Sequence, residues 1–453
     1  MLATIRSPRF KDELNATLRI AAPLALAQLA QMGIGLTDTV LLGALGRDAL
    51  AAGGLGAGLF FTTTIVIQGL VMSVGILVAH ARGAEEPHKI PALLRSGYVL
   101  AILAALPLML LLWHIEPLLL LIGEPPQLAH DVTAYIRILL FAVPASIWLG
   151  VQRSYLAAID NTQLVMIVAV GALLLNGFLN YGLIHGAFGL PEMGYLGSCT
   201  ATLVAMWVMF VATTAGMRRA EKHTSAPAAV DWRVVRELVA LGWPIAVTMG
   251  VEILLFLVGA LMMGGLGATA LAAHHVTIQV ASATFMVPLA VAQAANVRVG
   301  FHMGAHEPRA ARRAAFTAFA LGVGFMALAA IGMLIAPYQI ALAFNLDPTN
   351  VSDAEVIDLI VHLMLICAFF QVFDGAQTIA AGALRGMKDT RVPAVLAGLS
   401  YWGVGFPVAW GLAFPLGWGG PGVWWGLAVG LATAALVLNT RFWRLSARVV
   451  ANA

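Results

Sequence analysis

The chain has 453 residues, of which 10% are charged and 60% are hydrophobic, and its mean hydropathy is +0.90. Charged residues make up about 25% of an ordinary soluble domain, so this composition excludes a soluble protein and predicts an integral membrane protein. The net charge of +3 does not indicate a nucleic-acid partner, because the basic residues follow the membrane topology described below.

The apolar segments predict twelve membrane-spanning helices, since about 20 apolar residues cross the hydrocarbon core of a bilayer. The basic start of the chain runs straight into an apolar stretch, which predicts a first span rather than a cleaved signal peptide. The stretches without Asp, Glu, Lys or Arg are 20–37, 49–81, 96–115, 138–152, 161–191, 193–217, 314–346 and 392–440. Three more stretches, 238–262, 266–300 and 359–384, contain a single charge each. The run 392–440 is too long for one helix, and the sequence FPLGWGGPG within it predicts a turn.

The positions of Lys and Arg predict the orientation of these spans, because cytoplasmic loops carry the excess of both residues. With the N-terminus inside, the 25 basic residues fall in predicted cytoplasmic segments, except for Arg47 and Arg137. Both termini are therefore expected in the cytoplasm, and the protein is expected in the inner, cytoplasmic membrane.

The two halves of the chain resemble each other at a constant spacing. GRDALAAGG at 46 aligns with GATALAAHH at 267, and RGAEEP at 82 aligns with MGAHEP at 303, as does Pro23 with Pro244, in each case 221 residues apart. The polar linker 218–237 separates an N-lobe (1–217, spans 1–6) from a C-lobe (238–453, spans 7–12). An even number of spans per half makes the repeats parallel, related by a pseudo-two-fold axis along the membrane normal. This organisation favours a transporter over a static channel or scaffold, since parallel lobes can rock about a shared cavity.

Three acidic residues fall at bilayer depth: Asp38 in span 1, Glu252 in span 7 and Asp374 in span 10. The repeat places Glu252 over Gln31, so these acids are not symmetric copies. No Lys or Arg is predicted at comparable depth. A buried carboxylate without an ion-pair partner takes up a proton or binds a cation, and inside a membrane it marks an ion or substrate path. The alternative for each is a protonated, hydrogen-bonded core acid.

Other polar residues give weaker signals. Asn176 and Asn180 lie four apart on one face of span 5, where amides can line a cavity or tie helices together. His274 and His275 point in different directions on a helix and are expected to be core or interface residues, although the sequence leaves their role open. Cys199 and Cys367 each lie inside an apolar run, so they predict neither a disulfide nor a metal site.

Longer motifs resemble the multidrug and toxic compound extrusion (MATE) family over nearly the whole chain. They are LTDTVLLGALGRDALAA in span 1, LNGFLNYGLI in span 5, VEILLF in span 7, LAAHHVTIQVASATFMVP with RVG in span 8, and FFQVFDGAQTIAAGALRGMKDTRVP in span 10. The Glu of span 7 together with the Asp of span 10 resembles the NorM-type branch.

This resemblance implies an all-α fold of two six-helix lobes and the export of cationic, amphipathic drugs in exchange for Na⁺ or H⁺. It assigns Glu252 and Asp374 to a cation site of the C-lobe, which could hold Na⁺, and Asp38 to coupling and drug binding in the N-lobe. The remaining cavity positions that it implies are Asn176, Asn180, Thr202 and Gln279.

Two of these positions depart from the family pattern. Asn180 stands where another branch has a second aspartate, which puts an N-lobe Na⁺ site in doubt. Gln279 stands where many relatives have Asn, so the contribution of span 8 to the C-lobe site stays open.

The nearest alternative function is a lipid-linked oligosaccharide flippase of the same broad architecture, which would use Arg or Lys to bind pyrophosphate. An enzyme is not expected, because the spans contain no nucleophile–base or metal constellation. No cofactor is expected besides the coupling ion. The expected partners are cationic drugs, Na⁺ or H⁺ and membrane lipid, and the chain is expected to act as a monomer. The sequence leaves the coupling ion and the drug spectrum open.

Overall fold

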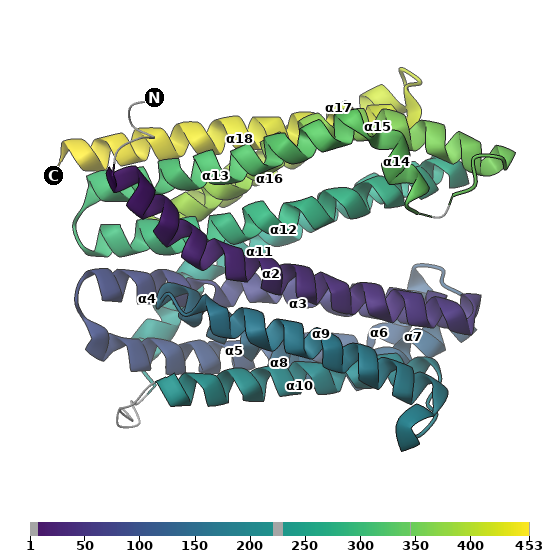
Figure 1. Cartoon of the computed structure of the whole chain (residues 1–453), viewed down its shortest axis with the longest axis horizontal. Coiled ribbons are helices and arrows are strands. Elements are labelled where there is room, and N and C mark those ends of the chain that lie inside the picture. The colour runs from purple at the N-terminus through teal and green to yellow at the C-terminus, as the bar shows by residue number, and fades with distance from the viewer. Residues whose placement is uncertain (1–7, 221–229, 345, 453) are drawn as a thin grey trace. The chain divides into compact units, whose positions relative to one another are not determined.

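A computed structural model describes residues 8–220, 230–344 and 346–452, and this part of the chain is almost entirely helical (Figure 1). Residues 221–229 of the predicted linker lie outside the described residues. The α-helices are α2 (Pro8–Leu45), α3 (Arg47–Val71), α4 (Ser73–Gly83), α5 (Ile90–Trp113), α6 (Ile115–Leu121), α7 (Pro126–Leu139), α8 (Val143–Ala158), α9 (Thr162–His185), α10 (Tyr195–Ala220), α11 (Trp232–Gly265), α12 (Ala268–Gly304), α13 (Pro308–Ile335), α14 (Pro337–Leu342), α15 (Val351–Gly386), α16 (Arg391–Gly398), α17 (Phe406–Ala413) and α18 (Gly419–Ala451). The short helices η1 (Pro87–Lys89), η2 (Leu140–Ala142) and η3 (Ala187–Gly189) are 3₁₀-helices, and η4 (Leu399–Gly405) is a π-helix.

Within the described residues, 12 helical segments are long and apolar enough to cross a membrane, which confirms the predicted number of spans. Several spans combine elements. One joins α3 to α4, another joins α7 to α8, and a third runs from α16 through η4 into α17. The turn predicted from FPLGWGGPG is also found, because α17 ends at Ala413 and α18 begins at Gly419.

The described residues form two compact units. Unit 1 contains residues 8–25, 82–85 and 247–452, and unit 2 contains most of the remainder, from Leu26 to Ala246. Helices α2 and α11 each contribute to both units, and they pass from one to the other after Ala25 and Ala246, which are again 221 residues apart. The lobes predicted from the sequence, 1–217 and 238–453, stay a prediction.

Unit 1 is built around α15, which packs against α12, α13 and α18 (Figure 1). Glycines allow the closest approaches. A Cβ at Gly382 of α15 would lie 2.3 Å from the carbonyl oxygen of Ala292 on α12, and one at Gly426 of α18 would lie 2.2 Å from the backbone of Ala409 on α17. Small residues let membrane helices approach closely, and here they fix the position of the α15 face that carries Asp374.

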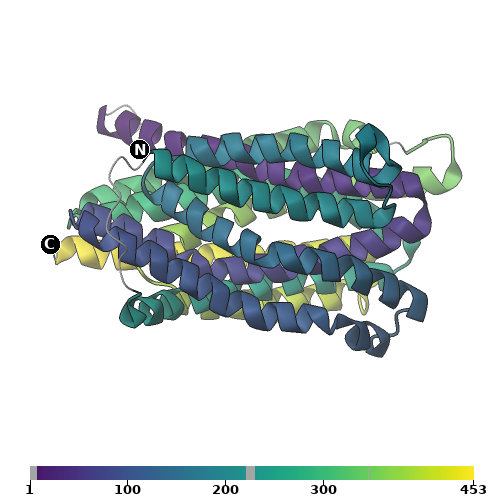
Figure 2. The same ribbon diagram turned by 90° about the horizontal axis from the view of Figure 1, so that it is seen from below.

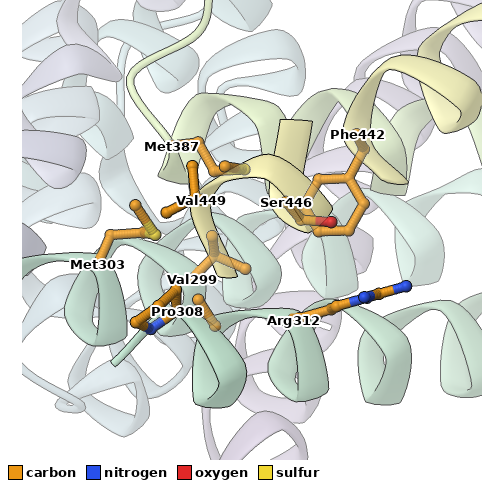
Figure 3. A pocket seen from close by; sticks show the side chains of 9 residues that line it. Val299, Met303, Pro308, Arg312, Met387, Phe442, Ser446 and Val449 are labelled. Carbon is orange, nitrogen blue, oxygen red and sulfur yellow. The ribbon is translucent and has the colours of Figure 1, made fainter. Parts of the chain in front are cut away.

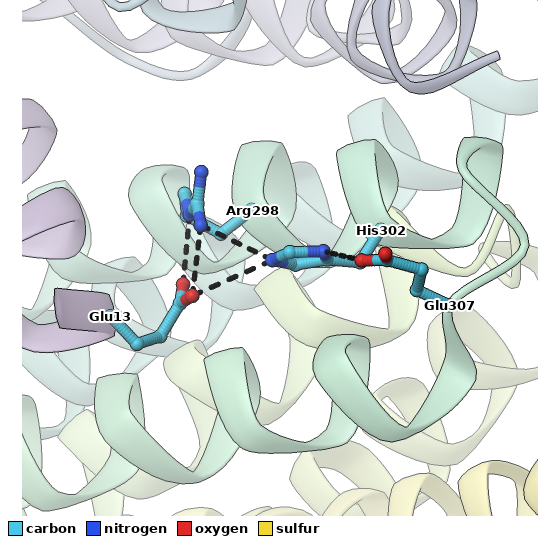
Figure 4. A network of polar contacts seen from close by, with 4 residues as sticks. All are labelled: Glu13, Arg298, His302 and Glu307. Carbon is cyan, nitrogen blue, oxygen red and sulfur yellow. Dashed lines mark hydrogen bonds and ion pairs between the residues drawn. The ribbon is translucent and has the colours of Figure 1, made fainter. Parts of the chain in front are cut away.

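The first turns of α2 are held to α12 in unit 1 by an ion cluster (Figure 4). Arg298 donates from Nε and Nη2 to the two oxygens of Glu13, both at 2.8 Å. His302 Nε2 lies 3.5 Å from Glu13, and its Nδ1 lies 3.0 Å from Glu307. At the positions 221 residues away from Glu13, Arg298 and His302 the chain has Val, Leu and Ala, so the cluster belongs to one half of the repeat.

Unit 2 is built from α3, α5 and α7–α10. Helices α9 and α10 lie side by side (Figure 2), and α8 packs against α3, α5 and α10. A Cβ at Gly197 of α10 would lie 2.7 Å from the backbone of Leu183 on α9. This close approach positions Asn176 and Asn180 of α9 beside Thr202 of α10.

Candidate cation and substrate sites

The first candidate site, in unit 1, is centred on the amide of Gln377. Its Nε2 donates to Glu252 Oε1 at 2.9 Å and to Asp374 Oδ1 at 3.2 Å. Glu252 comes from α11, whereas Asp374 and Gln377 lie one turn apart on α15. Asp374 is 5% exposed and Glu252 is half-buried. The two acids predicted to form the C-lobe site therefore share one hydrogen-bond donor.

Tyr401 fixes the orientation of that amide. Its hydroxyl donates to Gln377 Oε1 at 2.7 Å, so the nitrogen of the amide faces the two carboxylates. Tyr401 lies on the π-helix η4, and the neighbouring Trp402 donates from Nε1 to the carbonyl oxygen of Val251 at 3.3 Å. Short π-helical segments often occur at functional sites, and this one ties the α16–α17 span to the residue before Glu252.

The second candidate site, in unit 2, surrounds Asp38 of α2. Thr202 donates from Oγ1 to Asp38 Oδ2 at 2.9 Å, and Asn180 donates from Nδ2 to the other carboxylate oxygen. Asn176 links both donors, since it donates to Thr202 Oγ1 and accepts from Asn180, each at 3.2 Å. The structure thus brings together all four residues predicted for the N-lobe site. They are all buried, and Asp38 is 2% exposed.

One oxygen of this second site is unused within the described residues. Asn180 Oδ1 is buried and has no hydrogen-bond partner there. A buried acceptor without a partner is costly, and this one can accept from a protonated carboxyl group or contact a cation. The donors to Asp38 are neutral, so its charge can still be neutralised by a proton or a positively charged ligand.

The expectation that no basic residue lies at this depth is wrong. In unit 1, Arg385 of α15 is half-buried and close enough to Glu252 for an electrostatic interaction. In unit 2, Arg153 of α8 donates to Gln31 Oε1 at 3.3 Å and to Gln68 Oε1 at 3.1 Å. The sequence placed both arginines in loops, but long side chains extend along apolar helices and reach several turns from a helix end.

Gln279 is not brought to the first site, because its side chain is exposed on α12. His274 is buried with its ring 5.6 Å from that of Trp424, whereas His275 is exposed, so the two histidines face different surroundings. A small pocket in unit 1 is lined by Met303, Met387, Phe442 and their neighbours (Figure 3), and none of the predicted site residues lines it.

Sequence reasoning missed Gln377 and Tyr401. Gln377 had a usable signal, because residues three apart on a helix share a face and Gln377 follows Asp374 at that spacing. Tyr401 had none, since its approach to Gln377 depends on the π-helical turn of η4 and on long-range packing.

The MatE family model matches residues 23–182 and again 244–410. The chain belongs to the MatE family. The two matches begin at Pro23 and Pro244, the pair that opens the internal repeat, so the family pattern itself occurs twice in this chain.

Curated relatives place this MatE-family chain among the NorM multidrug resistance proteins. It is 48% identical to "Probable multidrug resistance protein NorM" of Burkholderia mallei, over 95% of this chain and 92% of the relative. It is also 48% identical to "Multidrug resistance protein NorM" of Burkholderia vietnamiensis, over 94% of this chain and 93% of the relative. As a member of this group the chain is a multi-pass membrane transporter rather than an enzyme.

Solved structures of MATE transporters share the fold. The eukaryotic MATE transporter AtDTX14 superposes with a TM-score of 0.84 at 22% identity, covering 97% of this chain and 99% of that one. A MOP superfamily transporter from Pyrococcus furiosus superposes with a TM-score of 0.87 at 16% identity, covering 96% of each chain. At these identities the likeness supports the all-α MATE-like fold alone.

Proposed function

We propose that this transporter exports cationic, amphipathic compounds in exchange for Na⁺ or H⁺ that moves into the cell. The observation that carries the proposal is the pair of acids, Glu252 and Asp374, held by one amide inside a membrane-spanning bundle. Two carboxylates that share a site repel each other, and a proton or a cation relieves this repulsion. Their oxygens, with the Tyr401 hydroxyl nearby, are hard ligands of the kind that suit Na⁺ as well as H⁺.

Asp38 is the proposed acid for drug binding and coupling in the N-lobe. A cationic drug and a proton compete for the same carboxylate, so each lowers the apparent affinity for the other. Asn176, Asn180 and Thr202 hold that carboxylate in place through neutral hydrogen bonds. The names of the NorM relatives support drugs as the cargo.

The alternative, a lipid-linked oligosaccharide flippase, needs a cluster of basic side chains to bind pyrophosphate. Arg153 and Arg385 do not supply one. They belong to different units, and Arg385 interacts with Glu252. The acids of both candidate sites favour positively charged cargo.

The decisive experiment is drug efflux from proteoliposomes that contain the purified protein, with the Na⁺ gradient and the pH gradient imposed separately. The expected result is efflux of a fluorescent cationic amphiphile with one of these gradients and its loss in Glu252→Gln and Asp374→Asn. Both variants keep the size of the side chain and remove the charge, so they are expected to stay folded. Loss of folded protein in detergent, instead of loss of efflux by folded protein, would show that the acids are structural.

The proposed placement is the inner membrane with both termini in the cytoplasm and a monomeric chain. It rests on the distribution of Lys and Arg. Reporter fusions in the linker between α10 and α11 are expected to report a cytoplasmic location, and a periplasmic signal would contradict the topology.

A further inference from the structure

The guanidinium group of Arg153 is held by neutral partners. Its hydrogen bonds go to Gln31 of α2 and Gln68 of α3, at 3.3 and 3.1 Å. Among the described residues it pairs with no carboxylate, in contrast to Arg298 and Arg441, which contact Glu13 at 2.8 Å and Asp389 at 2.6 Å. Arg153 is half-buried and lies in a membrane-spanning segment, where an uncompensated charge is costly and marks a functional site.

The free donors of Arg153 are suited to an oxyanion. A guanidinium group carries five N–H donors in a planar fork that matches a carboxylate, and the two glutamines use only part of this capacity. Gln68 is itself oriented, because its Nε2 donates to Ser146 Oγ at 3.2 Å. The oxygens of both amides therefore point to the guanidinium group and hold it in place without neutralising it.

Arg153 and Asp38 are placed along one side of α2. Gln31, which contacts Arg153, precedes Asp38 by seven residues. Seven residues are close to two full turns of an α-helix, so the two side chains leave α2 in nearly the same direction, separated by about 10 Å along the axis. Unit 2 thus presents a negative and a positive group on one helix face at a fixed spacing.

We propose that this pair of charges recognises zwitterionic amphiphiles, with the cationic end of the molecule at Asp38 and its carboxylate at Arg153. The proposal rests on the drug-export function above and extends its cargo from cations to zwitterions. A zwitterionic lipid headgroup fits less well, because its ammonium and phosphate groups are joined by a two-carbon linker that is shorter than the spacing of about 10 Å.

The test uses a rhodamine with a free carboxylate and its methyl ester, two fluorophores that differ only in that group. Binding of each dye to the purified full-length protein is followed by fluorescence anisotropy, and export is followed in proteoliposomes. We expect Arg153→Gln to reduce the affinity ratio of the carboxylate dye over the ester about tenfold, as for the loss of hydrogen bonds to a charged group. Arg153→Lys keeps the charge but lacks the fork, so an intermediate ratio is expected.

Several results would overturn this assignment. An equal loss of binding for both dyes in Arg153→Lys and Arg153→Gln would make Arg153 a structural residue, and an unchanged ratio would exclude carboxylate recognition. An effect of Arg153→Gln on both dyes that disappears in liposomes without anionic lipid would assign Arg153 to lipid phosphate. Failure of the wild-type protein to export either dye would contradict the export function, while the binding ratio would still decide the role of Arg153.

Discussion

Removal of one hydroxyl group tests how the first site works. Tyr401→Phe deletes the hydrogen bond of 2.7 Å to Gln377 Oε1. Gln377 is 3% exposed, so its oxygen would lose its partner without gaining water. The amide could then rotate and turn its oxygen, instead of its nitrogen, toward Glu252 and Asp374. The site would hold its two carboxylates less well, and its affinity for the coupling cation would fall.

The size of this effect follows from the burial of Gln377. A buried acceptor without a partner costs about 1–3 kcal/mol, and about 1.4 kcal/mol corresponds to a factor of ten in an equilibrium constant. We therefore expect the concentration of Na⁺ or H⁺ that half-saturates drug efflux to rise about tenfold in proteoliposomes. The matched control is Tyr338→Phe, because Tyr338 is 44% exposed and its hydroxyl should contribute little.

A double-mutant cycle separates the two routes by which Tyr401 can act, since Tyr401 also lies close to Glu252. If Tyr401 acts by orienting the amide, Tyr401→Phe should have almost no further effect in a Gln377→Ala background. The same tenfold change in both backgrounds would refute the reasoning, because Tyr401 would then act on Glu252 directly. A wild-type half-saturation value in the single variant would refute it as well.

Three further predictions concern the second site and the packing. Asp38→Asn should remove the pH dependence of drug affinity in purified protein, while a response to the ion bound at the first site persists; unchanged affinity at every pH would contradict the role of Asp38. Glu13→Gln leaves Arg298 without a counter-charge and should lower stability by about 3 kcal/mol, seen as a lower Tm in detergent, whereas the exposed Glu86 should tolerate the same change. Gly426→Ala should reduce the yield of folded protein because its Cβ would meet the backbone of α17, and an equal loss in Gly411→Ala, which has open space around it, would show a general effect of glycine replacement.

The spans and the repeat could be predicted from the sequence because they depend on local chemistry. A run of about 20 apolar residues defines a span wherever it occurs, and a constant spacing of motifs survives without knowledge of any contact. The acids were found for the same reason, since Glu252 and Asp374 stand out as isolated charges in such runs.

The partners of those acids could not be predicted, because they depend on side-chain reach and on irregular backbone. Arg153 and Arg385 were assigned to loops by their distance from the apolar runs, yet both extend to residues inside the bundles. The π-helix that carries Tyr401 has no periodic signature, since the wider turn arises from packing and not from a residue pattern.

The exchange of helix segments between the two units has a consequence for biosynthesis. Residues 8–25 leave the ribosome first, but they pack in the unit that is formed mainly by residues 247–452. Glu13 must therefore wait for Arg298, 285 residues later in the chain, before its charge is paired. Residues 230–246, in turn, complete the unit of the first half. A chain cut in the 218–237 linker would leave each fragment without part of its own unit, so the halves should mature only when both are present in the same membrane.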